Sequence, residues 1–161
     1  MVDFKKDTWL YALIAAILAI IALFTPWGTL EIDLTLLGFD TYTASSWLGG
    51  AVQNIPGLPA VMGPEWQGNG LGLWTFGLTV FSIALLLFYG VNTWKGKEFK
   101  WDWLMYLLSG LVMLICPILT LVLEGTSGAV IGFAPIGIII AGVIAIGAFA
   151  VDKFVGREQT E

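Results

Sequence analysis

The sequence GTLEIDLTLLGFDTYT runs from Gly28 to Thr43 and opens the one long segment, residues 28–70, that is neither a hydrophobic span nor a short positive connector. From Thr29 to Leu36 polar residues alternate with apolar ones, which is the period of a strand with one wet face. Gly38 interrupts this alternation, and β-branched and aromatic residues then resume. We therefore predict a β-hairpin that turns near residues 37 and 38.

The rest of this segment, from Ser45 to Gly70, combines three prolines with many glycines, which predicts irregular structure. It is nevertheless too apolar for a solvated linker, so we expect it to fold against lipid headgroups or against a partner. The candidate partner-binding residues are apolar side chains of the hairpin, of the loop and of its exit: Leu30, Ile32, Trp47, Trp66 and Trp74.

Composition indicates an integral membrane protein of one domain, residues 1–161. Of the 161 residues 58% are hydrophobic and 12% are charged, and the mean hydropathy is +0.88. A soluble domain has about a quarter charged residues. Four apolar runs are long enough to cross a hydrocarbon layer of about 30 Å. The predicted fold class is all-α, a bundle of four transmembrane helices with a small extracellular β-hairpin and an irregular loop at 28–70, and the predicted spans are residues 9–27, 71–94, 101–123 and 129–151.

The positive charges predict the orientation of the chain. None lies in residues 28–70 or 124–128, and all lie on the side shared by the two termini and the middle connector: Lys5, Lys6, Lys95, Lys97, Lys100, Lys153 and Arg157. Cytoplasmic loops of membrane proteins carry an excess of lysine and arginine. We therefore expect a multi-pass protein of the cell membrane with both termini in the cytoplasm and residues 28–70 outside. Tryptophans near the span ends agree, because their amphipathic rings prefer headgroup depth.

Small residues form one ridge on the first predicted span and another on the fourth. Helices in lipid associate through close packing, which small residues permit. We interpret both ridges as packing surfaces that close the bundle internally; the alternative is a seam between two copies. The ridges consist of Ala12, Ala15, Ala19 and Ala22, and of Gly137, Ala141, Ala145 and Ala148.

The sequence lacks the residues on which most membrane chemistry depends. It has no histidine and one cysteine, and no charged residue lies within a span away from its ends. Intramembrane ionisable residues mark ion pathways and proton relays, so we expect neither a secondary transporter nor a proton pump. We predict no enzyme activity, no cofactor and no nucleic-acid partner. Hydroxyl and amide residues of the spans lie near the ends or are scattered, and predict no pore lining: Thr75, Thr79, Asn92, Ser82, Ser109 and Thr120.

Four acidic residues lie in residues 28–70, which hold no basic residue: Glu31, Asp33, Asp40 and Glu65. Hard cations such as calcium take several oxygen ligands. A solvated acidic face is the favoured interpretation, since the spacing of a calcium-binding loop is missing. A calcium site is the alternative.

The tripeptide Gly72-Leu73-Trp74, preceded by Trp27, Trp47 and Trp66, together with four spans and a long first outer loop that opens with strands, resembles the claudin and peripheral myelin protein superfamily. The cysteine pair that follows the Gly-Leu-Trp of that family is absent here. The resemblance implies adhesion, barrier or membrane-organising work through the outer loop.

Two interpretations of function follow. The first is a non-enzymatic organiser or adhesion protein that contacts another protein, or a second copy of itself, through its outer loop. The alternative is a small cofactor-free accessory subunit of a larger membrane enzyme or transporter complex, packed through its small-residue ridges. In both, the partners are the lipid bilayer and other membrane proteins.

Overall fold

The described residues form four helices and a small sheet. The structure is a computed structural model that describes residues 7–32, 35–37, 42–47, 50–54, 70–97, 99–124 and 130–155. Its helices are α1 (Thr8–Leu23), α2 (Gly70–Trp94), α3 (Asp102–Glu124) and α4 (Phe133–Ala150), which continues into a π-helical turn (Val151–Val155). Its strands are β1 (Gly28–Ile32), β2 (Tyr42–Trp47), β3 (Gly50–Asn54) and β4 (Val130–Ile131), with a 3-10 turn at Thr35–Leu37.

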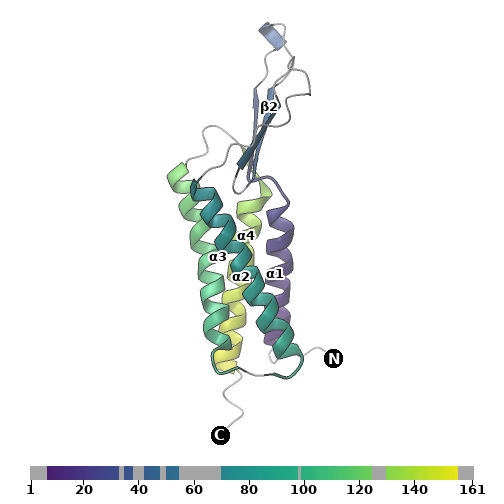
Figure 1. Cartoon of the computed structure of the whole chain (residues 1–161), viewed down its shortest axis with the longest axis vertical. Coiled ribbons are helices and arrows are strands. Elements are labelled where there is room, and N and C mark those ends of the chain that lie inside the picture. Colours follow the sequence, from purple (N-terminus) through teal and green to yellow (C-terminus); the bar gives the residue numbers. More distant parts are fainter. Residues whose placement is uncertain are drawn as a thin grey trace.

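The helices run side by side, and the sheet stands at one end of them (Figure 1). The start of α1, the connector between α2 and α3, and the end of α4 lie at the opposite end. The strand order is β3-β2-β1-β4, with β1 antiparallel to both of its neighbours. Because β4 lies between α3 and α4 in the sequence, both interhelix segments at this end contribute to one sheet.

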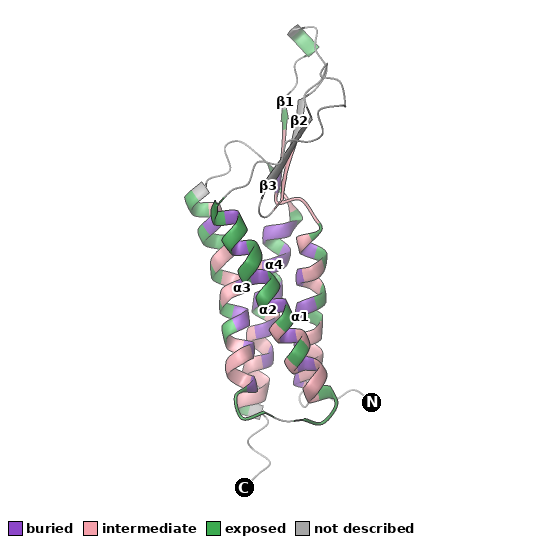
Figure 2. Ribbon diagram, in the orientation of Figure 1, coloured by how far each residue is buried: buried purple, intermediate pink, exposed green. Residues whose placement is uncertain are grey.

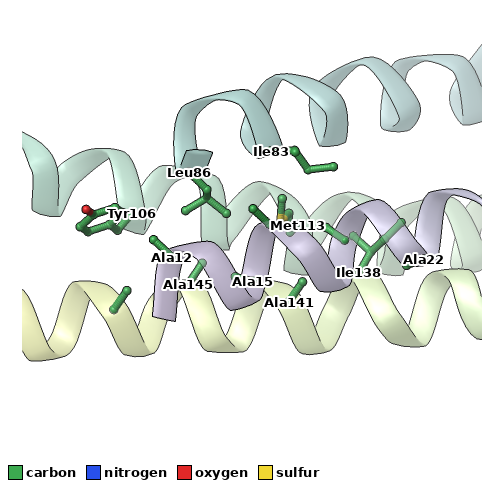
Figure 3. Close-up of a cluster of buried hydrophobic side chains, with 13 residues drawn as sticks. Ala12, Ala15, Ala22, Ile83, Leu86, Tyr106, Met113, Ile138, Ala141 and Ala145 are labelled. Atoms are coloured by element: carbon green, nitrogen blue, oxygen red, sulfur yellow. The ribbon is translucent and has the colours of Figure 1, made fainter. Parts of the chain in front are cut away.

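Most of the buried apolar side chains of the bundle are alanines, and many large apolar side chains are exposed. Figure 2 marks the buried and exposed positions along the helices. Ala15 and Ala141 are 0% exposed, whereas Ile17 is 54% and Phe81 61% exposed. A few larger side chains, Met113 among them, lie between the alanines (Figure 3). Water would disfavour such an arrangement and lipid tolerates it, which makes it typical of a membrane protein. Three helical segments are long and apolar enough to cross a membrane: Gly70–Trp94, Asp102–Leu123 and Phe133–Phe154.

Helices α3 and α4 cross at two glycines. A Cβ atom on Gly110 would lie 2.9 Å from the carbonyl oxygen of Gly142, and a Cβ atom on Gly142 would lie 2.8 Å from that of Gly110. Real Cβ atoms do not approach backbone oxygens so closely, so this crossing requires glycine on both helices. The sequence analysis singled out neither residue.

Helices α2 and α3 face each other through hydroxyl groups. The Thr75 and Thr120 hydroxyls are 2.7 Å apart, and the Thr120 hydroxyl also donates to the carbonyl of Cys116 at 2.9 Å. Five of the polar residues that the sequence places near span ends or scattered along the spans are buried in these two helices. We call this set the hydroxyl seam: Thr75, Thr79 and Ser82 of α2, and Ser109 and Thr120 of α3.

The connector end of the same two helices is also fastened by polar groups. Asp102, the first residue of α3, is buried, and its Oδ2 accepts the backbone N–H of Phe99 at 3.1 Å and the Thr93 hydroxyl at 3.5 Å. The hydroxyls of Thr93 and Tyr106 lie 3.2 Å apart. A carboxylate at a helix N-terminus is also favoured by the helix dipole.

Two of the predicted spans begin or end elsewhere than expected. The first was predicted to reach Trp27, but α1 ends at Leu23 and has 16 residues. Both the backbone N–H and the hydroxyl of Thr25 donate to the carbonyl of Ala22, and Pro26 has no N–H with which to continue the helix. The fourth was predicted from Ala129, but Val130 and Ile131 form β4 and α4 begins at Phe133.

The predicted hairpin is present, but its strands are shorter than predicted and the unpredicted strands β3 and β4 flank it. β1 pairs with β2 from Gly28 opposite Ser46 to Ile32 opposite Tyr42. The prediction of strand at Thr35 and Leu36 is wrong, because both belong to the 3-10 turn. The prediction of irregular structure from Ser45 to Gly70 is wrong for residues 45–47 and 50–54, because β2 continues to Trp47 and pairs with β3. Residues 48–49 and 55–69 lie outside the described part of the structure. The three prolines behind that prediction all follow β3.

Ala15→Leu should destabilise the bundle, because the larger side chain has no room in a fully packed site. Overpacking of this kind costs about 1–3 kcal/mol. The measurement is the thermal unfolding of the purified protein in a mild detergent. Ala84→Leu makes the same change at an exposed position of α2 and is the control. Equal melting temperatures for the two variants would contradict this packing.

Candidate interaction site at the sheet end of the bundle

The chain between α1 and β1 joins the sheet to the helices. The backbone N–H of Trp27 donates to the carbonyl of Ser46 on β2 at 2.6 Å, and the carbonyl of Trp27 accepts the N–H of Gly132 at 2.8 Å. One residue earlier, the carbonyl of Pro26 accepts the N–H of Ala134, in the first turn of α4, at 3.4 Å. Trp27 therefore connects the end of α1, the sheet and the start of α4 through its main chain.

Close backbone contact at Gly132 makes this junction possible. A Cβ atom at residue 132 would overlap the carbonyl oxygen of Pro26 and would lie 3.1 Å from the carbonyl carbon of Trp27. The backbone of Gly132 is extended, with φ −78° and ψ −177°, so the requirement is for space and not for an unusual conformation. Gly132 therefore packs against the chain that enters β1.

The predicted partner-binding residues lie on two separate elements. Leu30 on β1 and Trp47 at the end of β2 are half-buried in the sheet. Ile32 is the last residue of β1, opposite Tyr42, and its side chain lies outside the described part of the structure, as does all of Trp66. Trp74 lies on the second turn of α2 and is 73% exposed. Leu30 pairs with Ala44, three residues before Trp47, so Leu30 and Trp47 lie on opposite faces of the sheet. Trp74 belongs to the neighbouring helix end.

The small residues predicted for helix packing all lie inside the bundle. On α1 they face α4, since a Cβ atom on Gly137 would lie 2.8 Å from that of Ala22. A second contact joins α1 to α2, where a Cβ atom on Gly90 would lie 3.4 Å from that of Ala12. The buried set comprises Ala12, Ala15, Ala19 and Ala22 of α1, and Gly137, Ala141, Ala145 and Ala148 of α4. These surfaces are consequently occupied within one chain.

The acidic residues of the outer segment are described at one position. Glu31 is exposed on β1, while Asp33, Asp40 and Glu65 lie outside the described residues. Among the described residues no group of three or more histidine, cysteine, aspartate or glutamate side chains is placed to hold a metal ion. The calcium alternative therefore remains a prediction.

Exposed apolar side chains at this end extend beyond the predicted set. Leu36 in the 3-10 turn is 98% exposed, and the turn lies at the far tip of the projection (Figure 1). Phe24, just after α1, and Val130 on β4 are also strongly exposed. The β-branched pair Val130-Ile131 was the sequence signal for β4, but it was read as part of the fourth span.

No protein-family model matches the chain, and no curated protein matches it significantly. The site itself is a small sheet built from both interhelix segments, with exposed apolar side chains at Leu36, Phe24 and Val130.

Gly132→Ala should loosen the sheet from α4, because the added methyl group displaces the Pro26 carbonyl and breaks the hydrogen bond to Trp27. We expect faster amide hydrogen exchange at residue 132 and along β1. Gly147→Ala is the control, since a Cβ atom there meets nothing within 4 Å. Unchanged exchange in Gly132→Ala would show that the junction is not held by this contact.

Proposed function

We propose that the chain is a four-span protein of the cell membrane, with the sheet outside and both termini in the cytoplasm. Three helical segments have the length and hydropathy for spanning. Helix α1, of 16 residues, is about 24 Å long and packs against α2 and α4 with its alanine face. The apolar residues that follow it, among them the exposed Phe24, extend its apolar length toward the sheet.

Charge and aromatic residues support this orientation. The described lysines, Lys95, Lys97, Lys100 and Lys153, all lie in the connector or just after α4, at the end away from the sheet. The amine of Lys153 lies 4.6 Å from the centre of the Trp103 ring, and Trp9 and Trp94 stack at 6.0 Å. Cations and tryptophans gathered at one end match a cytoplasmic membrane interface.

Labelling of introduced cysteines tests the orientation. With Cys116→Ser as background, Glu31→Cys on β1 should react with a membrane-impermeant maleimide on intact cells. Lys97→Cys in the connector should react only after permeabilisation. Both positions are exposed, so access to reagent depends on the side of the membrane. The reverse pattern would contradict the proposed orientation.

The function that we propose is non-enzymatic: the protein organises or attaches membrane components by contacting another protein through the sheet end. The observation that carries this proposal is a sheet made from both interhelix segments and hydrogen-bonded to the ends of α1 and α4. Leu30 and Trp47 lie on opposite faces of this sheet, and Leu36 is exposed in the 3-10 turn. Regular secondary structure at these positions would reduce the entropy cost of binding. The arrangement also supports the proposed likeness to the claudin superfamily, in which outer segments carry the interaction.

The accessory-subunit alternative has less support. It was based on small-residue ridges that could pack against a larger complex, and these ridges are buried between α1, α2 and α4. An accessory role would have to use the larger lipid-facing side chains instead.

Crosslinking in native membranes, followed by mass spectrometry, tests the interaction. Replacing Leu30 and Trp47 by serine should remove a stoichiometric partner from the crosslinked product while the protein still inserts into the membrane. Ile17→Ala, on the lipid-facing side of α1, is the control and should retain the partner. Retention of the partner by the sheet variant would refute the proposal, and recovery of enzyme or transporter subunits would favour the accessory role.

A further inference from the structure

Hydrogen-bonding groups are divided unequally between the two halves of the bundle. Buried residues of α4, and those of α1 after Thr8, carry no side-chain hydroxyl. The hydroxyl seam lies entirely on α2 and α3. Two of its members, Thr79 and Ser109, are almost fully buried, and their hydroxyls have no hydrogen-bond partner among the described residues. A buried hydroxyl without a partner is unfavourable, and more so where no bulk water reaches it.

A main-chain carbonyl lies without its usual partner in the same part of α3. Pro117 lies within the helix and has no backbone N–H, so it cannot donate to the carbonyl of Met113. Met113 and Pro117 are both buried, four residues apart on the same face of α3. The acceptor that Pro117 leaves without its usual donor therefore lies on the inner side of the helix, where a Cβ atom on Gly142 of α4 would lie 3.1 Å from the carbonyl carbon of Met113.

The pairing of the two helices places Thr79 opposite Cys116, within one helical turn of the Met113 carbonyl. The hydrogen bond between Thr75 and Thr120 fixes one level, and the contact between Thr93 and Asp102 fixes another. Because the helices are antiparallel, four residues from Thr75 to Thr79 cover about 6 Å in the same direction as four residues from Thr120 back to Cys116.

The same counting places Ser82 near Met113, about 10 Å from the Thr75 level. Thr79 and Ser82 share the buried face of α2. Two hydroxyls on α2 thus lie within one helical turn of the free carbonyl on α3.

We propose that a water molecule binds in the hydroxyl seam at the level of Pro117, held by the hydroxyls of Thr79 and Ser82 and by the carbonyl of Met113. Buried waters make about three hydrogen bonds to polar groups that are otherwise unpaired, and this site offers three. The Thr79 hydroxyl makes no direct hydrogen bond to any described group, as expected for a bridged contact. The water joins α2 to α3 in mid-membrane, where the Pro117 break would otherwise leave both helices with unpaired groups.

Water-edited solid-state NMR of the labelled protein in lipid bilayers tests this site directly. Magnetisation from water protons should reach Thr79 and Ser82 at short mixing times. The methyl groups of Ala15 and Ala141, in the apolar half, are the dry reference, and Lys97 is the wet one. Transfer to Thr79 that is no faster than transfer to Ala141 would overturn the proposal.

Thr79→Val, which keeps the shape and removes the hydroxyl, gives a second test. If the hydroxyl binds water, we expect the melting temperature in detergent to fall by about 2–4 °C and the transfer to Ser82 to be lost. Removal of a hydroxyl that has no partner would instead raise the melting temperature, and that result would refute the site. Thr79→Ser retains the hydroxyl and should retain the transfer. If Thr79→Val does not fold, the rate of magnetisation transfer from water to Thr79 in the natural protein tests the site by itself.

Discussion

Close approach between helices is the constraint on which this structure depends. Lipid tails are as apolar as leucine, so moving a large side chain from lipid into the bundle lowers the free energy little. Close contact between two helix backbones still adds favourable dispersion energy. The chain meets this condition with alanine along α1 and α4 and with the glycine pair Gly110 and Gly142 between α3 and α4. The large side chains are then left for the outside, as with Ile17 and Phe81.

The attachment of the sheet to the helices also depends on close backbone contact. Its junction with the helices is formed by main-chain groups of Pro26, Trp27 and Gly132, and a single methyl group at residue 132 would separate them. Since α1 leads into β1 and β4 leads into α4, the sheet is fastened to the half of the bundle that has the smallest side chains.

Much of this fold could be predicted from the sequence, and the failures have physical reasons. Hydropathy located all four helices, because spans must satisfy their backbone groups internally and therefore read as long apolar runs. It misplaced the end of α1 and the start of α4, because residues 24–27 and Val130-Ile131 carry no charge that would mark the end of a span. Strand β3 was missed because Gly50–Asn54 lacks alternation, and its place is set by pairing with β2.

The candidate site was harder to predict than the fold. Leu30 and Trp47 were singled out because a period of two and a loop tryptophan are local signals, and the structure places both in one sheet. Gly132 and the hydroxyl seam depend on which segments meet in space, and neither spacing nor composition contains that information. Ser109 and Thr120 look scattered along the chain because their burial exists only once the helices are packed.

The two halves of the bundle are therefore held by different kinds of interaction. Apolar contacts between α1 and α4 set the distance between these two helices. They fix the register of one helix against the other only through the fit of the side-chain surfaces. Between α2 and α3 the Thr75–Thr120 bond lies near one end and the Thr93–Asp102–Tyr106 contacts lie at the other. Hydrogen bonds are directional, so these two ties fix the register of α2 against α3 on either side of the Pro117 break. Hydroxyls can do this at depth because, unlike carboxylates or amines, they carry no charge whose burial must be compensated.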